Sequence, residues 1–314
     1  MRSGDTGVFI EIEGLRSYAL NVAAATEMRG AVSAAHLAAS VMSSLNDIRS
    51  AVKSLTETAA ERRSISKSEE WLLDNWYIAE RGGKRAARDL KRSGCLPGVK
   101  GGGRRPALSV AAASLVVAGR GVITEKRIKA FFEGFQNLIT LSESEISTLI
   151  PVITAELILF LRSACRETGV ERELLFENVF TSLRFLGGFD AAELLKGLSR
   201  VEETLRKDPA GLYALMSEET RGAYRREISH IALRRKMTEE EAAKSALQLA
   251  EKAKVHIGYY IFIMPLGAAK RKNPGGGYIA FNTIISLFIA LFIGMLTSDA
   301  VVFALSLLPI SELV

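Results

Sequence analysis

The feature that most constrains this 314-residue chain is an uncharged stretch of nineteen residues near its C-terminus, Tyr278–Leu296 (YIAFNTIISLFIALFIGML). As an α-helix rising 1.5 Å per residue it would be about 28 Å long, which matches the hydrocarbon core of a bilayer. A buried helix of a soluble protein is the alternative, but uncharged runs of that kind are usually shorter, about 10–14 residues. The stretch therefore predicts a membrane-spanning helix.

A second apolar run, Ala300–Ile310, follows a short polar break and is too short to cross a bilayer on its own. Only four residues come after it. We therefore expect residues 278–314 to be a transmembrane helical hairpin whose second span is incomplete.

Basic residues orient this expected hairpin. Lys270, Arg271 and Lys272 precede the first span, whereas Asp299 is the charge that closely follows it. Because basic residues accumulate on the cytoplasmic side of membrane proteins, residues 1–275 are predicted to be cytoplasmic. The three basic side chains are expected at the membrane interface, where they can contact lipid headgroups of the bilayer. The first residues are interrupted by acidic side chains, so no signal peptide is expected.

The basic character of the chain has several possible meanings. A net charge of +6 and a pI near 9.3 are compatible with nucleic acid or an anionic membrane as partner. The basic residues alternate with glutamates and are not interleaved with aromatic residues, so we expect solvated helix faces and no nucleic-acid partner. Cys95 and Cys165 provide neither a disulfide framework nor a paired metal-ligand spacing.

From about residue 13 to residue 265, apolar residues recur at helical spacing behind capping signals, which predicts an all-α fold. The predicted helix starts are at Ser66 with Glu69, Thr124 with Glu125, Ser142 with Glu145, and Thr238 with Glu241. Pro151 is expected to kink or restart its helix. Only GVFIEIEG (residues 7–14) alternates as a strand does, and the Gly-rich and Pro-rich segment Ser93–Pro106 is expected to be a loop.

These signals divide the chain into four expected parts. They are an N-terminal helical segment (1–63), a helical cytoplasmic domain (64–265), a basic, glycine-rich hinge (266–277) and the transmembrane hairpin (278–314).

The chain lacks the common catalytic and metal-binding motifs, so we assign it no catalytic residue, no metal ligand and no cofactor-binding residue. The three histidines are far apart in sequence, and a lone histidine is more often structural. The segment KGGGRR (Lys100–Arg105) could hold a phosphate through glycine amides and two guanidinium groups, but a solvated basic loop is the favoured interpretation. Trp71, Trp76 and Tyr77 could form a sugar-binding platform, and core packing is favoured for them.

Five segments in order, between Ser64 and Val314, resemble the N-terminal region of the cyclic β-1,2-glucan synthases, which are very large bacterial inner-membrane glycosyltransferases. The segments are EWLLDNWYIAE (Glu70–Glu80), RRPALSVAAASLV (Arg104–Val116), FFEGFQNLITLSESEISTLIPVI (Phe131–Ile153), DPAGLYALMSEETRGAYRREISHIA (Asp208–Ala232) and VHIGYYI (Val255–Ile261). The family-motif residues that carry the resemblance are Glu70, Trp71, Leu72, Leu73, Asp74, Asn75, Thr220, Arg221, Tyr224, Arg225, His256, Gly258, Tyr259 and Tyr260. The chain departs from the family pattern at Arg104–Pro106, at Ile146–Leu149, where a tryptophan of the family is absent, at Ser217 and at Gly222.

The resemblance implies a whole enzyme that transfers glucose from UDP-glucose, builds a β-1,2-linked glucan and cyclises it. It places UDP-glucose and a divalent metal in a transferase domain that would follow residue 314, so this chain would be the anchoring and scaffolding piece, without activity alone. Its expected partners are then the bilayer and the downstream transferase and phosphorylase-like regions, in cis or in trans. The alternative is a stand-alone, membrane-anchored helical adaptor with no catalysis.

Overall fold

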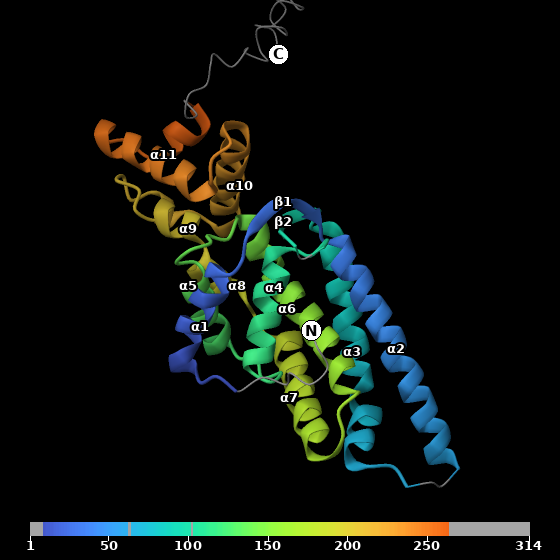
Figure 1. Ribbon diagram of the computed structural model, residues 1–314. Helices are drawn as coiled ribbons and strands as arrows, with labels where there is room; N and C mark the ends of the chain where they lie inside the picture. The colour runs from blue at the N-terminus through green and yellow to red at the C-terminus, as the bar shows by residue number, and fades with distance from the viewer. Residues whose placement is uncertain (1–8, 62–63, 102, 264–314) are drawn as a thin grey trace, which may run out of the picture. The chain divides into compact units, whose positions relative to one another are not determined.

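The structure is a computed structural model that describes residues 9–61, 64–101 and 103–263, and these residues are mostly helical, as the sequence predicts (Figure 1). The hinge, the hairpin and the basic residues Lys270, Arg271 and Lys272 lie outside the described residues. By their contacts, the described residues up to Phe262 belong to one compact unit. The expected division at residue 63 falls between two helices of this unit that pack against each other.

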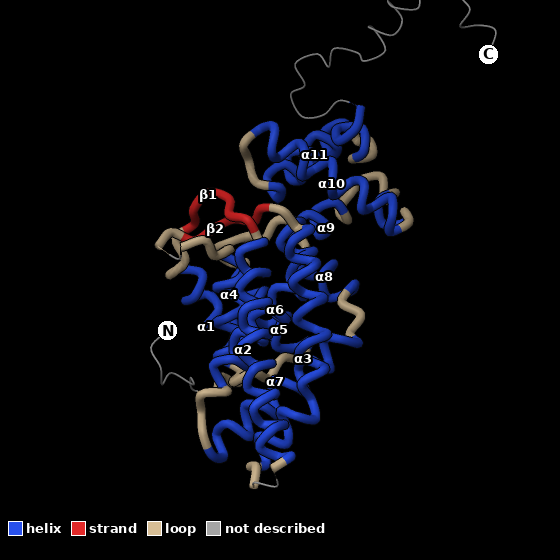
Figure 2. Tube along the Cα trace, turned by 90° about the vertical axis from the view of Figure 1, so that its right-hand side faces the viewer, coloured by secondary structure: helices blue, strands red, loops and turns tan. Residues whose placement is uncertain are grey.

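The helices are α1 (Ile12–Ala24), α2 (Ala35–Ala60), α3 (Lys67–Arg92), α4 (Ala107–Ala118), α5 (Glu125–Phe135), α6 (Glu143–Ala164), α7 (Gly169–Gly188), α8 (Ala192–Leu198), α9 (Arg200–Leu205), α10 (Glu218–Arg235) and α11 (Glu239–Ala253). A 3-10 turn, η1 (Tyr213–Leu215), lies between α9 and α10, and a π-helical turn, η2 (Tyr259–Ile263), follows α11. Helices α9 to α11 gather at one end of the unit and α7 lies at the other (Figures 1 and 2).

Helix α6 is the centre of the core. It contacts α2, α3, α4 and α7 (Figure 2). The side chains of Leu149, Ile153, Leu157 and Leu161 are fully buried along it. Within the described residues, α6 is the one helix whose length and apolar composition would suffice to cross a membrane. Most of its apolar stretch is buried against the surrounding helices. Such burial is typical of an apolar helix in the core of a packed domain.

The predicted helix starts are confirmed. Thr124 accepts a hydrogen bond from the N–H of Arg127 at the start of α5. Reciprocal capping boxes begin three other helices, formed by Ser66 with Glu69, Ser142 with Glu145, and Thr238 with Glu241. Each capping contact joins residues three positions apart, so it depends on the local sequence and not on distant parts of the chain.

Pro151 does not restart its helix, because α6 runs without interruption from Glu143 to Ala164 with Pro151 inside it. The expected kink at Pro151 stays a prediction. A proline removes the hydrogen bond to the carbonyl four residues earlier, here that of Ser147. Ser147 and Pro151 both line an open hollow on the surface of the unit.

Two short strands accompany the helices, at places where the sequence does not predict them. The alternating segment 7–14 is not one of them in its described part, since α1 begins at Ile12. The expected loop 93–106 instead contains strand β2 (Cys95–Val99), which pairs antiparallel with β1 (Met28–Ser33). Gly98 permits the pairing, because a Cβ there would lie 2.8 Å from the carbonyl oxygen of Gly30.

Candidate functional site

The six consecutive family-motif residues, Glu70–Asn75, lie on the first turns of α3 and contribute to packing. Leu72 is buried, Trp71 and Leu73 are half-buried, and Glu70 and Asp74 are exposed. Asn75 is buried, donates to the carbonyl of Trp71 at 2.8 Å and accepts from Arg184 on α7. The segment therefore contributes packing contacts and a hydrogen bond between α3 and α7.

The expectation of core packing for the aromatic residues holds for two of the three. Trp71 and Trp76 are half-buried and pack against the hydrophobic core. Tyr77 is 61 % exposed, because the buried face of α3 follows Leu72, Ile78 and Ala79 instead.

The other two motif segments meet in space. They form a polar cluster, here called the joint, between α9, α10 and the turn after α11. The joint consists of the side chains Glu202, Asp208, Tyr213, Tyr224, Arg225 and His256. Tyr224, Arg225 and His256 were among the residues singled out in the sequence.

The first half of the joint is a chain of three side chains. Asp208 Oδ2 lies 2.7 Å from His256 Nδ1, and His256 Nε2 lies 2.8 Å from the hydroxyl of Tyr224. The N–H of Ile257 donates to Asp208 Oδ1 at 2.9 Å. This chain connects three segments that are separated in sequence, the loop after α9, helix α10 and the segment that leads into η2.

The carboxyl group of Asp208 is held in its charged form. Burial alone would raise its pKa, but hydrogen bonds from the Ile257 N–H, His256 and the Tyr213 N–H outweigh burial and lower the pKa below its ordinary value. A carboxylate with this many donors is a strong local anchor for the backbone around it.

Glu202 is the centre of the second half. Its side chain is 2 % exposed and accepts from the Tyr213 hydroxyl at 2.6 Å and from Arg225 at 2.6 Å. Arg206 donates to its other oxygen at 2.9 Å. Burial opposes the charge, yet these donors outweigh it and lower the pKa of Glu202. Tyr213 links the two halves, because its N–H donates to Asp208 and its hydroxyl to Glu202.

Gly258 lies against the joint, at a position where there is no room for a side chain. A Cβ at this position would lie 2.5 Å from the Tyr224 hydroxyl and 2.7 Å from His256 Nε2. The glycine of the motif HIGYY is therefore required by the close approach of two hydrogen-bonded side chains rather than by a turn.

The remaining motif residues lie around the joint. Arg221 is half-buried and donates to Glu202 at 3.4 Å. Thr220 is exposed, and its N–H is capped by the Ser217 hydroxyl at the start of α10. Tyr259 and Tyr260 lie on η2, with their rings edge to face at 5.3 Å between centroids.

An Asp–His–Tyr chain of hydrogen bonds also occurs in catalytic sites, but in the joint this chain does not line the neighbouring hollow. Among the described residues, the neighbouring hollow of about 250 Å³ is lined by Glu202 and Arg225 and not by Asp208, Tyr224 or His256. Burial raises the pKa of Tyr224, which keeps its hydroxyl protonated. In the part of the chain that the structure describes, no three His, Cys, Asp or Glu residues are grouped as a metal site.

Sequence reasoning missed Glu202, Asp208 and Tyr213. Asp208 and Tyr213 stand inside a segment that carries the resemblance, but their spacing follows no motif with a known chemistry. Glu202 is one of many helical glutamates, and only its neighbours in space distinguish it.

Exchanging Asp208 for asparagine is expected to destabilise the folded chain by about 1–3 kcal/mol at pH 7. Because folding lowers the pKa of Asp208, the charged carboxylate stabilises the fold above its unfolded pKa of about 4. That contribution is lost as the pH falls through the lower folded value, so the difference between the two proteins shrinks below about pH 4. Urea unfolding of the full chain in non-ionic detergent at pH 7 and pH 3.5 measures this.

The matched control is Asp74→Asn, at an exposed position on α3. It is expected to change stability by less than about 0.5 kcal/mol at either pH. A destabilisation by Asp208→Asn that is the same at both pH values would contradict the assigned role of the charge.

No protein-family model matches the chain, and no curated protein sequence is significantly similar to it.

Proposed function

We propose that this chain is the N-terminal anchoring and scaffolding part of a cyclic β-1,2-glucan synthase of the bacterial inner membrane, with residues 1–275 in the cytoplasm. In this role a membrane hairpin at residues 278–314 connects the helical unit to a transferase region that follows. The glucosyl transfer from UDP-glucose belongs to that region.

The observation that supports the proposal is the joint. Two of the five segments that resemble the family, around Tyr224 and His256, are hydrogen-bonded to each other through the Asp208–His256–Tyr224 chain. The later segment ends in η2, at the last described residues before the expected hinge. A connection of this kind would transmit the position of the helical unit to the chain that continues toward the membrane, which is what a scaffold requires.

The test measures incorporation of radiolabelled glucose from UDP-glucose into glucan by membranes that carry this chain. We expect no incorporation by the chain alone, and incorporation when the downstream transferase and phosphorylase-like region is supplied in trans. The downstream region by itself is the control and is expected to be less active than the pair. Equal activity with and without this chain would contradict the scaffolding role and favour the adaptor alternative.

Topology is tested separately, by reporter fusions at Gly276. Cytoplasmic reporter activity is expected, and periplasmic activity would contradict the orientation deduced from the basic residues Lys270, Arg271 and Lys272.

A further inference from the structure

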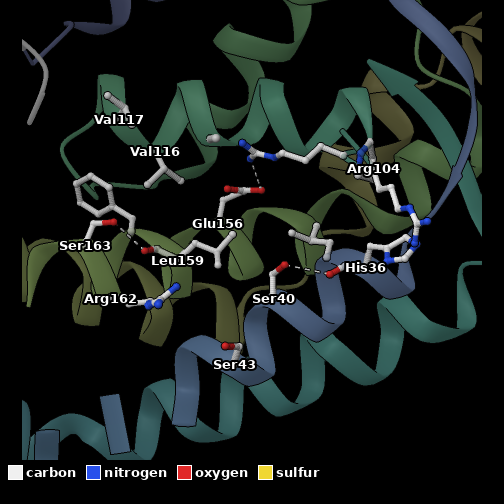
Figure 3. A pocket seen from close by; sticks show the side chains of 15 residues that line it. His36, Ser40, Ser43, Arg104, Val116, Val117, Glu156, Leu159, Arg162 and Ser163 are labelled. Carbon is white, nitrogen blue, oxygen red and sulfur yellow. Dashed lines mark hydrogen bonds and ion pairs between the residues drawn. The ribbon is translucent and has the colours of Figure 1, made fainter. Parts of the chain in front are cut away.

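A second region of the unit has the properties of a ligand pocket. It is a hollow of about 520 Å³ between α2, α4, α6 and the loop before α4 (Figure 3). Pockets for small organic ligands commonly measure about 300–1,000 Å³. The hollow lies outside the joint, and the two share no lining residue.

The walls of this hollow are largely apolar. The apolar lining residues are Leu37, Pro106, Ala113, Val116, Val117, Leu159 and Phe160. They come from three helices of the core and from the residue before α4. Such walls bury the hydrocarbon or aromatic body of a ligand, since each apolar group removed from water stabilises the complex.

Cationic groups stand at the rim and in one wall. Arg104 and Arg105 come from the segment KGGGRR, and Arg162 comes from α6. Figure 3 shows Arg104 beside His36, at the end of the hollow away from Val117. Arg104 Nη1 lies 3.4 Å from His36 Nε2.

Two of these arginines are neutralised by carboxylates and the third is not. Arg105 donates to Glu156 at 3.0 Å, and Arg162 is paired with Asp47 at 2.7 Å. Among the described residues, no carboxylate pairs with Arg104. The pocket therefore has a surplus of one positive charge, located at Arg104.

Glu156 makes this pocket a built site rather than an accidental gap. Its side chain is 4 % exposed, and it also accepts a hydrogen bond from the buried hydroxyl of Ser109. A buried carboxylate is costly unless it is paired, so Glu156 fixes Arg105 and with it the end of the loop that carries Arg104. Burial raises the pKa of Glu156, while Arg105 and the Ser109 hydroxyl favour its charged form. In that form the carboxylate disfavours a second negative charge on a ligand.

We propose that this pocket binds a small amphipathic organic anion with a single carboxylate or phosphate charge. The charged group is held by Arg104 next to His36, and the apolar body lies against α4 and α6. Arginine suits this role because its planar guanidinium group can donate two parallel hydrogen bonds to either kind of anion. The proposal is independent of the proposed function.

The test uses the full chain in nanodiscs of zwitterionic lipid, with calorimetric titration of 4-phenylbutyrate and subtraction of empty nanodiscs. We expect saturable binding with a Kd of about 0.1–1 mM, as for a ligand of this size. The neutral alcohol 4-phenylbutan-1-ol is expected to bind at least about tenfold more weakly because it lacks the charge. Methyl phenyl phosphate, a phosphodiester with a single negative charge, serves as the second anion, and the anion that binds more tightly identifies the preferred charged group.

Two variants locate the ligand. Arg104→Gln is expected to weaken binding at least about tenfold, whereas Lys100→Gln removes a charge from the same loop outside the pocket and should leave the Kd within about twofold. Ala113→Phe fills the apolar part of the pocket and should abolish binding while the helical circular dichroism is unchanged. Absence of saturable binding, equal binding of acid and alcohol, or equal loss in the Arg104 and Lys100 variants would overturn the proposal.

Discussion

Replacing Glu202 with alanine is expected to destabilise the folded chain by about 3–5 kcal/mol, the range found when one partner of a buried ion pair is removed. Glu202 is almost fully buried and accepts from Tyr213, Arg225 and Arg206. The substitution leaves the buried Tyr213 hydroxyl without its acceptor, and a buried donor without an acceptor retains its full cost of desolvation. It also removes the most deeply buried of the carboxylates around Arg225, which keeps Glu218 and Glu143 as partners.

The measurement is urea unfolding of the full chain in non-ionic detergent at pH 7, followed by helical circular dichroism. Glu203→Ala is the matched control, because Glu203 is the next residue on α9 and forms exposed ion pairs with Arg200 and Lys207. Exposed pairs contribute about 0–1 kcal/mol, so the control should remain close to the unaltered chain. Similar losses in the two variants would show that the joint contributes no more than a solvated pair.

The second large effect is expected for Gly258→Ala, at about 2–3 kcal/mol, the upper part of the range for overpacking a tight site. The new methyl group would lie 2.5 Å from the Tyr224 hydroxyl and 2.7 Å from His256 Nε2. Either the ring of Tyr224 or that of His256 must move, and the hydrogen bond between them is then lost. Since this bond connects α10 to the segment that leads into η2, residues Tyr259–Ile263 should also become less protected.

Hydrogen exchange of the full chain, read by mass spectrometry, tests this second consequence. We expect faster exchange at Tyr259–Ile263 in the variant, with α6 unchanged. Gly197→Ala is the control, since a Cβ on that exposed glycine of α8 would meet no atom within 4 Å. A methyl group there should be neutral or stabilising by up to about 1 kcal/mol. Unchanged exchange at η2 in Gly258→Ala would mean that the joint does not hold this segment.

These two variants also connect stability to the proposed scaffolding role. If the joint positions the segment that leads toward the membrane, Gly258→Ala should reduce glucan synthesis in the trans assay more than Gly197→Ala does. Equal activity of the two variants would restrict the joint to the folding of the helical unit.

The sequence by itself determined where many helices begin and that the described residues are mostly helical. The capping boxes at Ser66, Ser142 and Thr238 each involve residues three positions apart, so their geometry follows from the local chain alone. The stripe Ile128, Phe131 and Phe135 is buried for the same reason, since helical periodicity fixes which residues share a face.

Only the tertiary structure decided the features that depend on distant partners. β1 and β2 pair across more than sixty residues, from segments with too little alternation to predict a strand. The exposure of Tyr77 was set by the helices that cover the other side of α3, and the continuity of α6 through Pro151 by the packing around it. Asp208 and His256 form a direct hydrogen bond, and Tyr213 links Asp208 to Glu202. They become a joint because folding brings these distant residues together and removes water, which no short-range pattern encodes.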